Sequence, residues 1–207
     1  MKKWLPWLLL LLLPVVGVKG WRAWDQARFE GSGQVAPEAP WQQSVDERPF
    51  SHGPWILTPL ARFSVAARVL HAKDYRGERD GDVVPVDLAL GWGGMSDRRV
   101  LEHFRFGQQN RYYTWRADSW VLPQREIVRS SANMHLVPAT PEIEAELLKA
   151  RRGDVVSFWG SLVRIGGAEQ AWISSQTRED DGARACEVVY VEAFRRVPVA
   201  EYPAVPQ

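Results

Sequence analysis

Two side chains of this sequence, Cys186 and His135, are of the types that carry out nucleophilic catalysis. A cysteine nucleophile acts as a thiolate, which needs a nearby imidazole or another positive group. Cys186 is the only cysteine, and no local signature of a cysteine hydrolase surrounds it. It opens the run "CEVVYVEAF" and shares a face there with Val188 and Tyr190. We therefore expect Cys186 to be a small buried hydrophobic residue, with a catalytic Cys186 and His135 as the alternative.

Metal binding is the second chemistry to consider. The histidines stand at positions 52, 71, 103 and 135, with no H-x-x-H or H-x-x-x-H spacing. Met134 and His135 are ligand types that suit Cu(I), but neighbours on a strand point to opposite faces. The sequence predicts neither a metal site nor a cofactor.

The stretch "SSANMHLVPAT", residues 130–140, holds two further candidates. Its alternation predicts a brief strand that ends at Pro138, because the residue before a proline is driven to an extended conformation. Met134 and Leu136 then face the core, and Asn133 and His135 face the other way. We expect Asn133 and His135 at the rim of the domain, in a polar groove of unknown ligand.

The second wall of that groove is expected from the acidic loop Thr177 to Glu187. Arg178 and Asp180 are its candidate ligand-binding residues. The loop lacks the D-x-D-x-D-G pattern of a calcium site. A solvated hairpin turn with Gly182 at a positive φ is the simpler interpretation.

An aromatic and basic stretch, "RFGQQNRYYTWRADSW", offers a third set of candidate ligand-binding residues. Alternation puts Arg111, Tyr113 and Trp115 on one face of a strand. Seven arginines against three acidic residues between positions 98 and 129 give a local charge excess of about +4. Aromatic side chains beside polar ones are typical of sheet faces that bind glycans or other oligomers.

A mostly β framework has to position these side chains. Alternation predicts strands at 63–70, 84–90, 111–115, 155–165, 171–175 and 186–194. A helix is expected from Thr140 to Arg152, with Thr140 as its N-cap and Pro141 at its first position, and a shorter one from Ser96 to Phe104. We expect an α+β fold, mostly β with one or two helices, as a small Greek-key barrel of the OB type. An α+β sandwich is the alternative.

The N-terminal residues bear on location. Lys2 and Lys3 precede an apolar stretch from Trp4 to Val18, so residues 1–20 are expected to be either a signal peptide or an inner-membrane anchor. Both alternatives place the rest outside the cytoplasm, in the periplasm or beyond. We expect residues 21–54 to be a juxtamembrane segment and Pro/Gly-rich spacer, 55–196 a single β-rich domain, and 197–207 a flexible tail.

The charge balance argues against a nucleic-acid partner. Lys2, Lys3 and Lys19 take three from the 26 basic residues, which leaves 23 against 25 acidic ones in the exported part. A nearly neutral chain has no general attraction to nucleic acid. We expect a partner in the cell envelope, a protein or a glycan.

Several motifs resemble those of a group of bacterial envelope proteins for which no activity is established. They are "VDLALGWGGMSD", "SSANMHLVPA", "GDVV" and "WISSQTREDDGARACEVVYV", and the likeness runs from Trp55 to Val191. The resemblance implies a periplasmic protein, either N-terminally anchored or secreted, with one folded domain.

The function expected from the sequence is therefore that of an exported, non-catalytic binding or assembly module. The alternative is a periplasmic hydrolase or thiol enzyme that uses His135 and Cys186.

Overall fold

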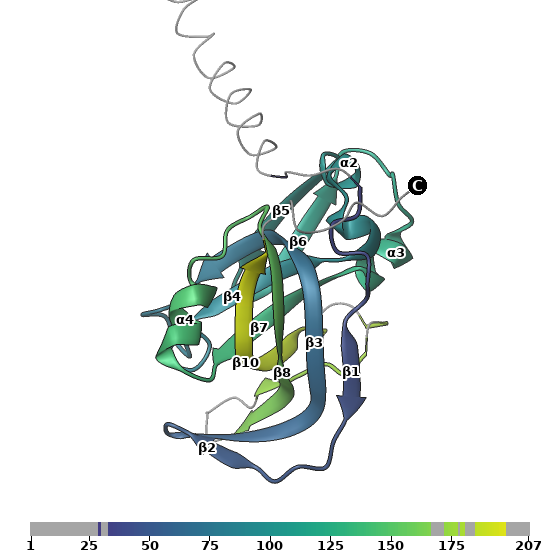
Figure 1. The fold of residues 1–207 in the computed structure, drawn as a ribbon. Helices are drawn as coiled ribbons and strands as arrows, with labels where there is room; N and C mark the ends of the chain where they lie inside the picture. Colours follow the sequence, from purple (N-terminus) through teal and green to yellow (C-terminus); the bar gives the residue numbers. More distant parts are fainter. Residues whose placement is uncertain (1–28, 30–32, 167–171, 178, 181–184, 198–207) are drawn as a thin grey trace, which may run out of the picture.

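The structure is a computed structural model that describes residues 29, 33–166, 172–177, 179–180 and 185–197. Strands dominate, with three short α-helices and one 3-10 turn among these residues, so the fold is of the α+β class (Figure 1). The elements in chain order are β1 (Trp41–Ser44), β2 (Phe50–His52), β3 (Trp55–Asp74), β4 (Val86–Gly91), η1 (Gly93–Ser96), α2 (Arg98–Leu101), β5 (Phe104–Gln109), β6 (Tyr112–Ala117), α3 (Gln124–Arg129), β7 (Ser131–Pro138), α4 (Pro141–Leu147), β8 (Val155–Gly166), β9 (Trp172–Ile173) and β10 (Glu187–Val197).

Eight of the strands form one sheet whose pairings run full circle. The order is β3, β4, β7, β10, β8 and back to β3, with β1 and β2 added along β3 and β9 along β8. Strands β7 and β10 are parallel, and the other pairs are antiparallel. The 20-residue strand β3 bends strongly and pairs with four other strands (Figure 1).

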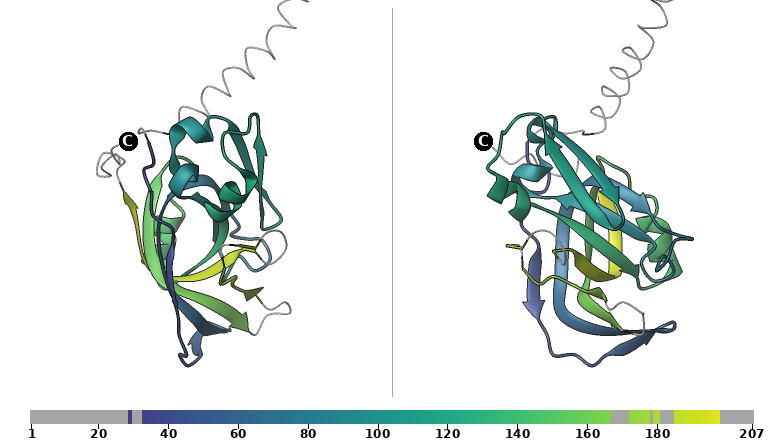
Figure 2. Two further views of the ribbon diagram at one scale, coloured as in Figure 1. Left: turned by 90° about the vertical axis from the view of Figure 1, so that its right-hand side faces the viewer. Right: turned by 180° about the vertical axis from the view of Figure 1, so that it is seen from behind.

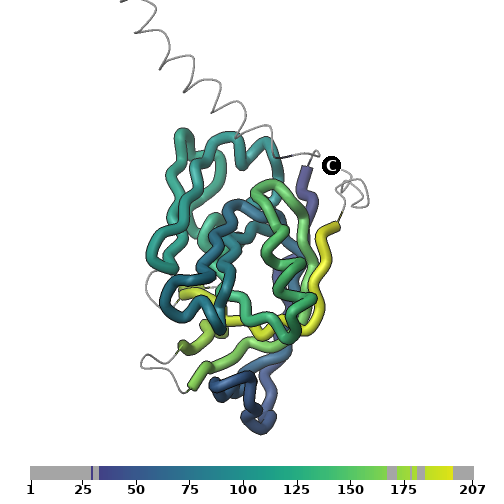
Figure 3. The backbone as a smooth tube through the Cα atoms, turned by 90° about the vertical axis from the view of Figure 1, so that its left-hand side faces the viewer, coloured from purple at the N-terminus to yellow at the C-terminus, as the bar shows by residue number. Residues whose placement is uncertain are grey.

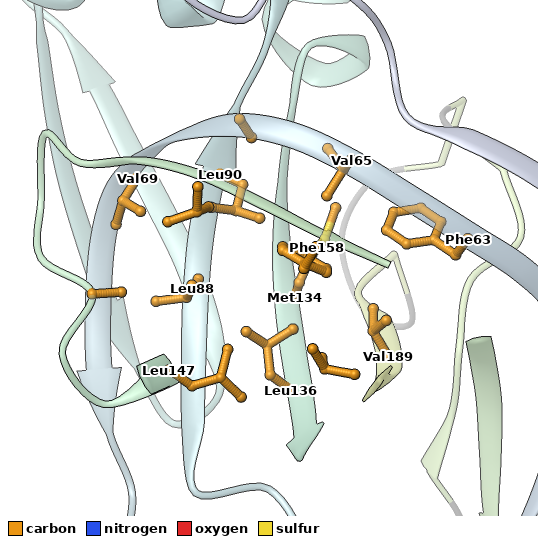
Figure 4. Close-up of a cluster of buried hydrophobic side chains, with 14 of the residues drawn as sticks. Phe63, Val65, Val69, Leu88, Leu90, Met134, Leu136, Leu147, Phe158 and Val189 are labelled. Carbon is orange, nitrogen blue, oxygen red and sulfur yellow. The ribbon is translucent and has the colours of Figure 1, made fainter. Parts of the chain in front are cut away.

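The alternation of side chains places the main core between the strands of this ring. In β3 the odd positions from 57 to 67 are buried and the even ones are partly exposed, as expected for a strand with one buried face. Figure 4 shows Phe63 and Val65 pointing toward Leu88, Met134 and other apolar side chains. Met134 and Leu136 both belong to this cluster, so the predicted core face of the stretch 130–140 is confirmed.

Close backbone contact between β8 and β10 requires glycine at position 160. A Cβ atom there would lie 1.8 Å from the carbonyl oxygen of Tyr190. The β10 register shifts between Val191 and Ala193, opposite this glycine. Gly160 therefore allows the strands to pack at the irregularity.

Strands β5 and β6 form a separate hairpin beside the ring (Figure 2, left). Its turn residues Asn110 and Arg111 have φ of 52° and 67°, as the tight mirror-image hairpin turns require. In Figure 3 the teal segment that contains the hairpin runs along one side of the molecule. A second apolar cluster, which includes Phe104 and Ile127, packs under it.

The helices differ in detail from the prediction. Helix α4 begins at the expected N-cap, where Thr140 Oγ1 accepts a hydrogen bond from the Ile143 amide, but it ends at Leu147. The expected helix at 96–104 contains only α2. Helix α3 was not predicted, so the described residues hold three helices rather than one or two.

Part of the expected spacer belongs to the fold. Within residues 33–54, β1 and β2 pair with β3, and Val35 and Ala36 are buried. No helix in the described residues is both long and apolar enough to cross a membrane. Residues 4–18, the expected signal or anchor, and the tail 198–207 lie outside the described residues.

Candidate functional site

The candidate site begins with a cross-strand pair on the face of the sheet opposite to Met134. Asp87 of β4 lies directly opposite His135 of β7 in the antiparallel register. Asp87 is fully buried, and His135 is 5% exposed. Their side chains meet, with 3.0 Å between His135 Nδ1 and Asp87 Oδ1. The N–H direction misses the oxygen, so the contact is an ion pair rather than an aligned hydrogen bond.

Arg111 completes a three-membered charge network from the turn of the β5–β6 hairpin. Its Nη1 donates to Asp87 Oδ1 at 2.9 Å and to the carbonyl oxygen of Val84 at 3.0 Å. The guanidinium lies 3.6 Å from the centre of the Tyr75 ring, in cation–π geometry. Trp172 of β9 covers the network, with its ring edge-on to His135 at 4.8 Å. A buried carboxylate thus has two cationic partners.

Cys186 lies just before β10 and is partly exposed. It interacts electrostatically with the His135 side chain. Burial alone lowers the pKa of His135, but the interactions with Asp87 and then Cys186 outweigh burial and raise the pKa to about 9. The imidazole is therefore protonated at neutral pH. The expectation that Cys186 is a small buried hydrophobic residue is not met, because its side chain is partly exposed and lines a pocket.

A chain of amide hydrogen bonds fixes the orientation of Asn133, next to the thiol. His71 Nδ1 is 2.8 Å from Gln108 Oε1, and Gln108 Nε2 donates to Asn133 Oδ1. Because its oxygen is occupied, the Asn133 amide turns its Nδ2 toward Cys186. Nδ2 donates to the carbonyl oxygen of Arg111 at 3.0 Å and lies 4.0 Å from Cys186 Sγ.

Cys186 and Asn133 line a pocket of about 160 Å³. Its other lining residues come from β6, α3, β7 and the segment before β10: Tyr112, Tyr113, Trp115, Val128, Ser131, Ala132, Asp180 and Ala185. Burial raises the pKa of Tyr113 far above its ordinary value, so this phenol stays neutral. The partly exposed thiol is thus accessible from this pocket.

The structure brings together most of the residues expected from the sequence. Cys186, His135, Asn133 and Arg111 form one network, and Tyr113, Trp115 and Asp180 line the adjacent pocket. Asn133 and His135 were expected toward the rim, in a polar groove near the loop that follows Thr177. Asn133 does line a pocket together with Asp180 of that loop. Both residues are nevertheless buried, because the β5–β6 hairpin and Trp172 cover this face. Arg178 lies outside the described residues.

Sequence reasoning missed three members of the site: Asp87, Gln108 and His71. Asp87 is a carboxylate inside the apolar run "VVPVDLALG", which could have marked it, because buried carboxylates are rare unless they are paired. Gln108 and His71 carry no comparable signal. Among the described residues there is no group of three His, Cys, Asp or Glu side chains suited to hold a metal ion.

Comparison with protein families, with curated proteins and with solved structures gives no match to this chain.

Proposed function

We propose that the protein is a thiol-dependent acyl-transfer enzyme or hydrolase in which Cys186 is the nucleophile. The observation that carries this proposal is the imidazole of His135, which contacts the Asp87 carboxylate and interacts with the thiol of Cys186, a residue that lines a pocket. A nucleophile, a base and a group that orients the base are the three parts of cysteine and serine acyl-transfer sites. Asp87 is itself held by Arg111.

Asn133 supplies the remaining part, a donor to the oxyanion. Acyl transfer passes through a tetrahedral intermediate whose negative oxygen needs a fixed N–H donor. Asn133 Nδ2 lies 4.0 Å from Cys186 Sγ, and its carbonyl oxygen is already held by Gln108. The amide therefore cannot rotate freely away from the place where the oxygen develops.

The reaction follows from these positions. The Cys186 thiolate attacks the acyl carbon, a C–S bond forms, and the carbonyl oxygen becomes an oxyanion opposite Asn133. Protonated His135 gives its proton to the leaving group as the bond to the acyl carbon breaks, which leaves a thioester on Cys186. Neutral His135 then takes a proton from water, and the hydroxide attacks the thioester carbonyl. The C–S bond breaks, the carboxylic acid is released, and the Cys186 thiolate and protonated His135 are restored.

We also propose that the ring is a barrel of the OB type. In chain order its strands are β3, β4, β7, β8 and β10, and the parallel pair joins the third to the fifth. The single helix between the third and fourth strands, α4, supports this interpretation. OB proteins bind ligands on the face of strands two and three and with the loop between strands four and five. Asp87, His135 and Asn133 lie on those two strands, and Cys186 follows that loop.

A non-catalytic binding module of the cell envelope is the second candidate. It is favoured by two exposed tryptophans on the outer surface of the sheet. Trp41 and Trp159 flank Ser64 across neighbouring strands and are 54% and 52% exposed. Two indoles on one sheet face suit a flat ligand such as a glycan. Under this proposal Trp159→Ala removes the fluorescence change on titration with chito-oligosaccharides, and no change in the wild-type protein would rule out this ligand.

Acylation of Cys186 tests the enzyme proposal. The full-length protein is mixed with p-nitrophenyl acetate at pH 7, and both nitrophenolate release and the mass of the protein are followed. We expect a burst of nitrophenolate and one acetyl group on Cys186. His135→Gln abolishes the burst. His103→Gln is the control and leaves the burst intact, because His103 is a surface histidine whose side chain is hydrogen-bonded to Ser119. A wild-type protein that reacts no faster than free cysteine refutes the proposal.

A further inference from the structure

The pocket beside Cys186 limits the size of the group that the thiol can attack. Its volume of about 160 Å³ is close to that of a cavity that holds one benzene molecule, about 150 Å³. The walls are Tyr112, Tyr113 and Trp115 on the hairpin side and Val128 of α3. A substrate therefore places a group about as large as one amino-acid side chain in it.

One wall of the pocket carries a carboxylate. Asp180 is the one charged side chain among the described lining residues, and Tyr113 stays neutral because burial raises its pKa. Its neighbour Glu179 belongs elsewhere, since it pairs with Arg129 and Arg125 of α3 on the outer surface. The arginines of α3 thus pair with Glu179, and among the described residues neither forms an ion pair with Asp180.

Hydrogen bonds hold Asp180 in a fixed relation to the thiol. Ser175 Oγ donates to Asp180 Oδ2 at 2.7 Å, and the Ser175 amide donates to the carbonyl oxygen of Cys186 at 3.0 Å. Ser175 itself is buried. One small residue therefore links the carboxylate to the backbone of the nucleophile.

Aromatic rings beside a carboxylate are a chemical environment for cations. Ring faces attract ammonium and guanidinium groups, and a partly desolvated carboxylate adds a charge-assisted hydrogen bond. An anionic group in the same place would be repelled by the Asp180 carboxylate. A neutral apolar group that entered the pocket would displace water from the carboxylate without replacing its hydrogen bonds, which is unfavourable.

We propose that this pocket selects substrates that carry a small cationic group, an ammonium or guanidinium, next to the carbon attacked by Cys186. The inference rests on the proposed function, because it assumes that Cys186 is the attacking atom. It adds the class of substrate: an amine-bearing acyl donor, such as an ester or amide of a basic amino acid.

Three thiol reagents that differ only in charge test the proposal, because Cys186 is the only cysteine. They are the 2-aminoethyl, ethyl and 2-sulfonatoethyl methanethiosulfonates, which are cationic, neutral and anionic. In each reaction the thiolate attacks the sulfur that bears the organic group, a mixed disulfide forms, and methanesulfinate leaves. The rate constants for the full-length protein are divided by those for 2-mercaptoethanol.

We expect the cationic reagent to react about fivefold faster than the anionic one. One nearby charge contributes about 1 kcal/mol in a water-like medium, which corresponds to a factor of about five in rate. Asp180→Asn reduces this ratio to about one. Glu179→Gln, which removes the same charge from the adjacent residue, keeps the wild-type ratio. A wild-type ratio near one, or a ratio that survives Asp180→Asn, overturns the inference.

The outcome is separable from that of the proposed function. His135→Gln is expected to slow all three reagents together and, because it removes a positive charge near the thiol, to raise the preference for the cationic reagent. If p-nitrophenyl acetate fails to acylate Cys186 while the ratio depends on Asp180, the enzyme proposal falls and the cation site stands. If acylation depends on His135 while the ratio is near one, the enzyme proposal stands and the substrate class is wrong. Unchanged urea unfolding of Asp180→Asn shows that its folding is intact.

Discussion

The charge of His135 makes a quantitative prediction about stability and pH. Its pKa is raised from 6.5 to about 9 in the folded protein, mainly because of Asp87 and Cys186 acting against burial. Below pH 6.5 the imidazole holds its proton in the folded and the unfolded chain alike. Between pH 6.5 and about 9 only the folded chain keeps it, and above that range neither does. The stabilisation is therefore complete below pH 6.5 and is lost as the pH rises through 9.

The magnitude follows from the difference between the two pKa values. One pKa unit corresponds to about 1.4 kcal/mol, so the charged imidazole contributes about 3 kcal/mol to the free energy of unfolding at low pH. The side chain is only 7% exposed, so solvent screening reduces this figure little. We expect the free energy of unfolding of the wild-type protein to fall by about 3 kcal/mol between pH 6 and pH 10 because of this one group.

Urea unfolding followed by tryptophan fluorescence at five pH values measures the effect. Other groups also titrate in this range, so the wild-type curve is compared with that of His135→Gln. Between pH 6 and pH 10 the variant should lose about 3 kcal/mol less of its free energy of unfolding than the wild-type protein does. His103→Gln, on the surface, should follow the wild-type curve. Parallel curves for wild type and His135→Gln would refute the reasoning, because His135 would then be neutral in the fold and could not form an ion pair with Asp87.

Three further predictions concern the core and the site. Met134→Ala should lower the free energy of unfolding by about 2–4 kcal/mol in urea melts, because it truncates a fully buried side chain; a loss below about 1 kcal/mol would place Met134 outside the core. Gly160→Ala should lower the free energy of unfolding by about 3 kcal/mol in the same urea melts. Gly166→Ala is the control and should lower it little, because its Cβ would lie 3.6 Å from the carbonyl oxygen of Ile56. Equal losses for the two variants would contradict the close backbone contact at Gly160. Gln108→Leu should slow acylation by p-nitrophenyl acetate about tenfold, because it frees the Asn133 amide, but should leave iodoacetamide alkylation of Cys186 unchanged, since alkylation forms no oxyanion. Equal slowing of both reactions would show that Gln108 acts on the thiol rather than on Asn133.

The strands that surround the core were predictable because one of their faces is buried. Alternation located β4, β8 and β10, and the Thr140-Pro141 start located α4. The hairpin was only half predicted. Strand β6 alternates clearly, but "FRFGQQ" of β5 does not, and an Asn-Arg turn lacks the glycine that usually marks a mirror-image hairpin turn.

The site was predictable in its residue types but not in its pairing. Polar residues at alternate positions of a strand usually indicate a face that is exposed to solvent. This rule failed for Asn133 and His135 because the β5–β6 hairpin folds over them. Asp87 could be joined to His135 only from the register between β4 and β7, and that register depends on the closed ring. No local pattern in the sequence indicates which residues of two distant strands lie opposite each other.

The parallel pairing of β7 with β10 sets the order in which the site can assemble. Asn133 and Cys186 are 53 positions apart, whereas β3 and β4 pair through a short connection. Contacts between distant segments form late, because the entropy of closing a long loop opposes them. We expect a newly synthesised chain to hold its thiol apart from His135 until β10 docks. Nucleophilic reactivity would then appear only when the fold is complete. The rate at which the thiol becomes reactive would therefore report the rate of the last step of folding.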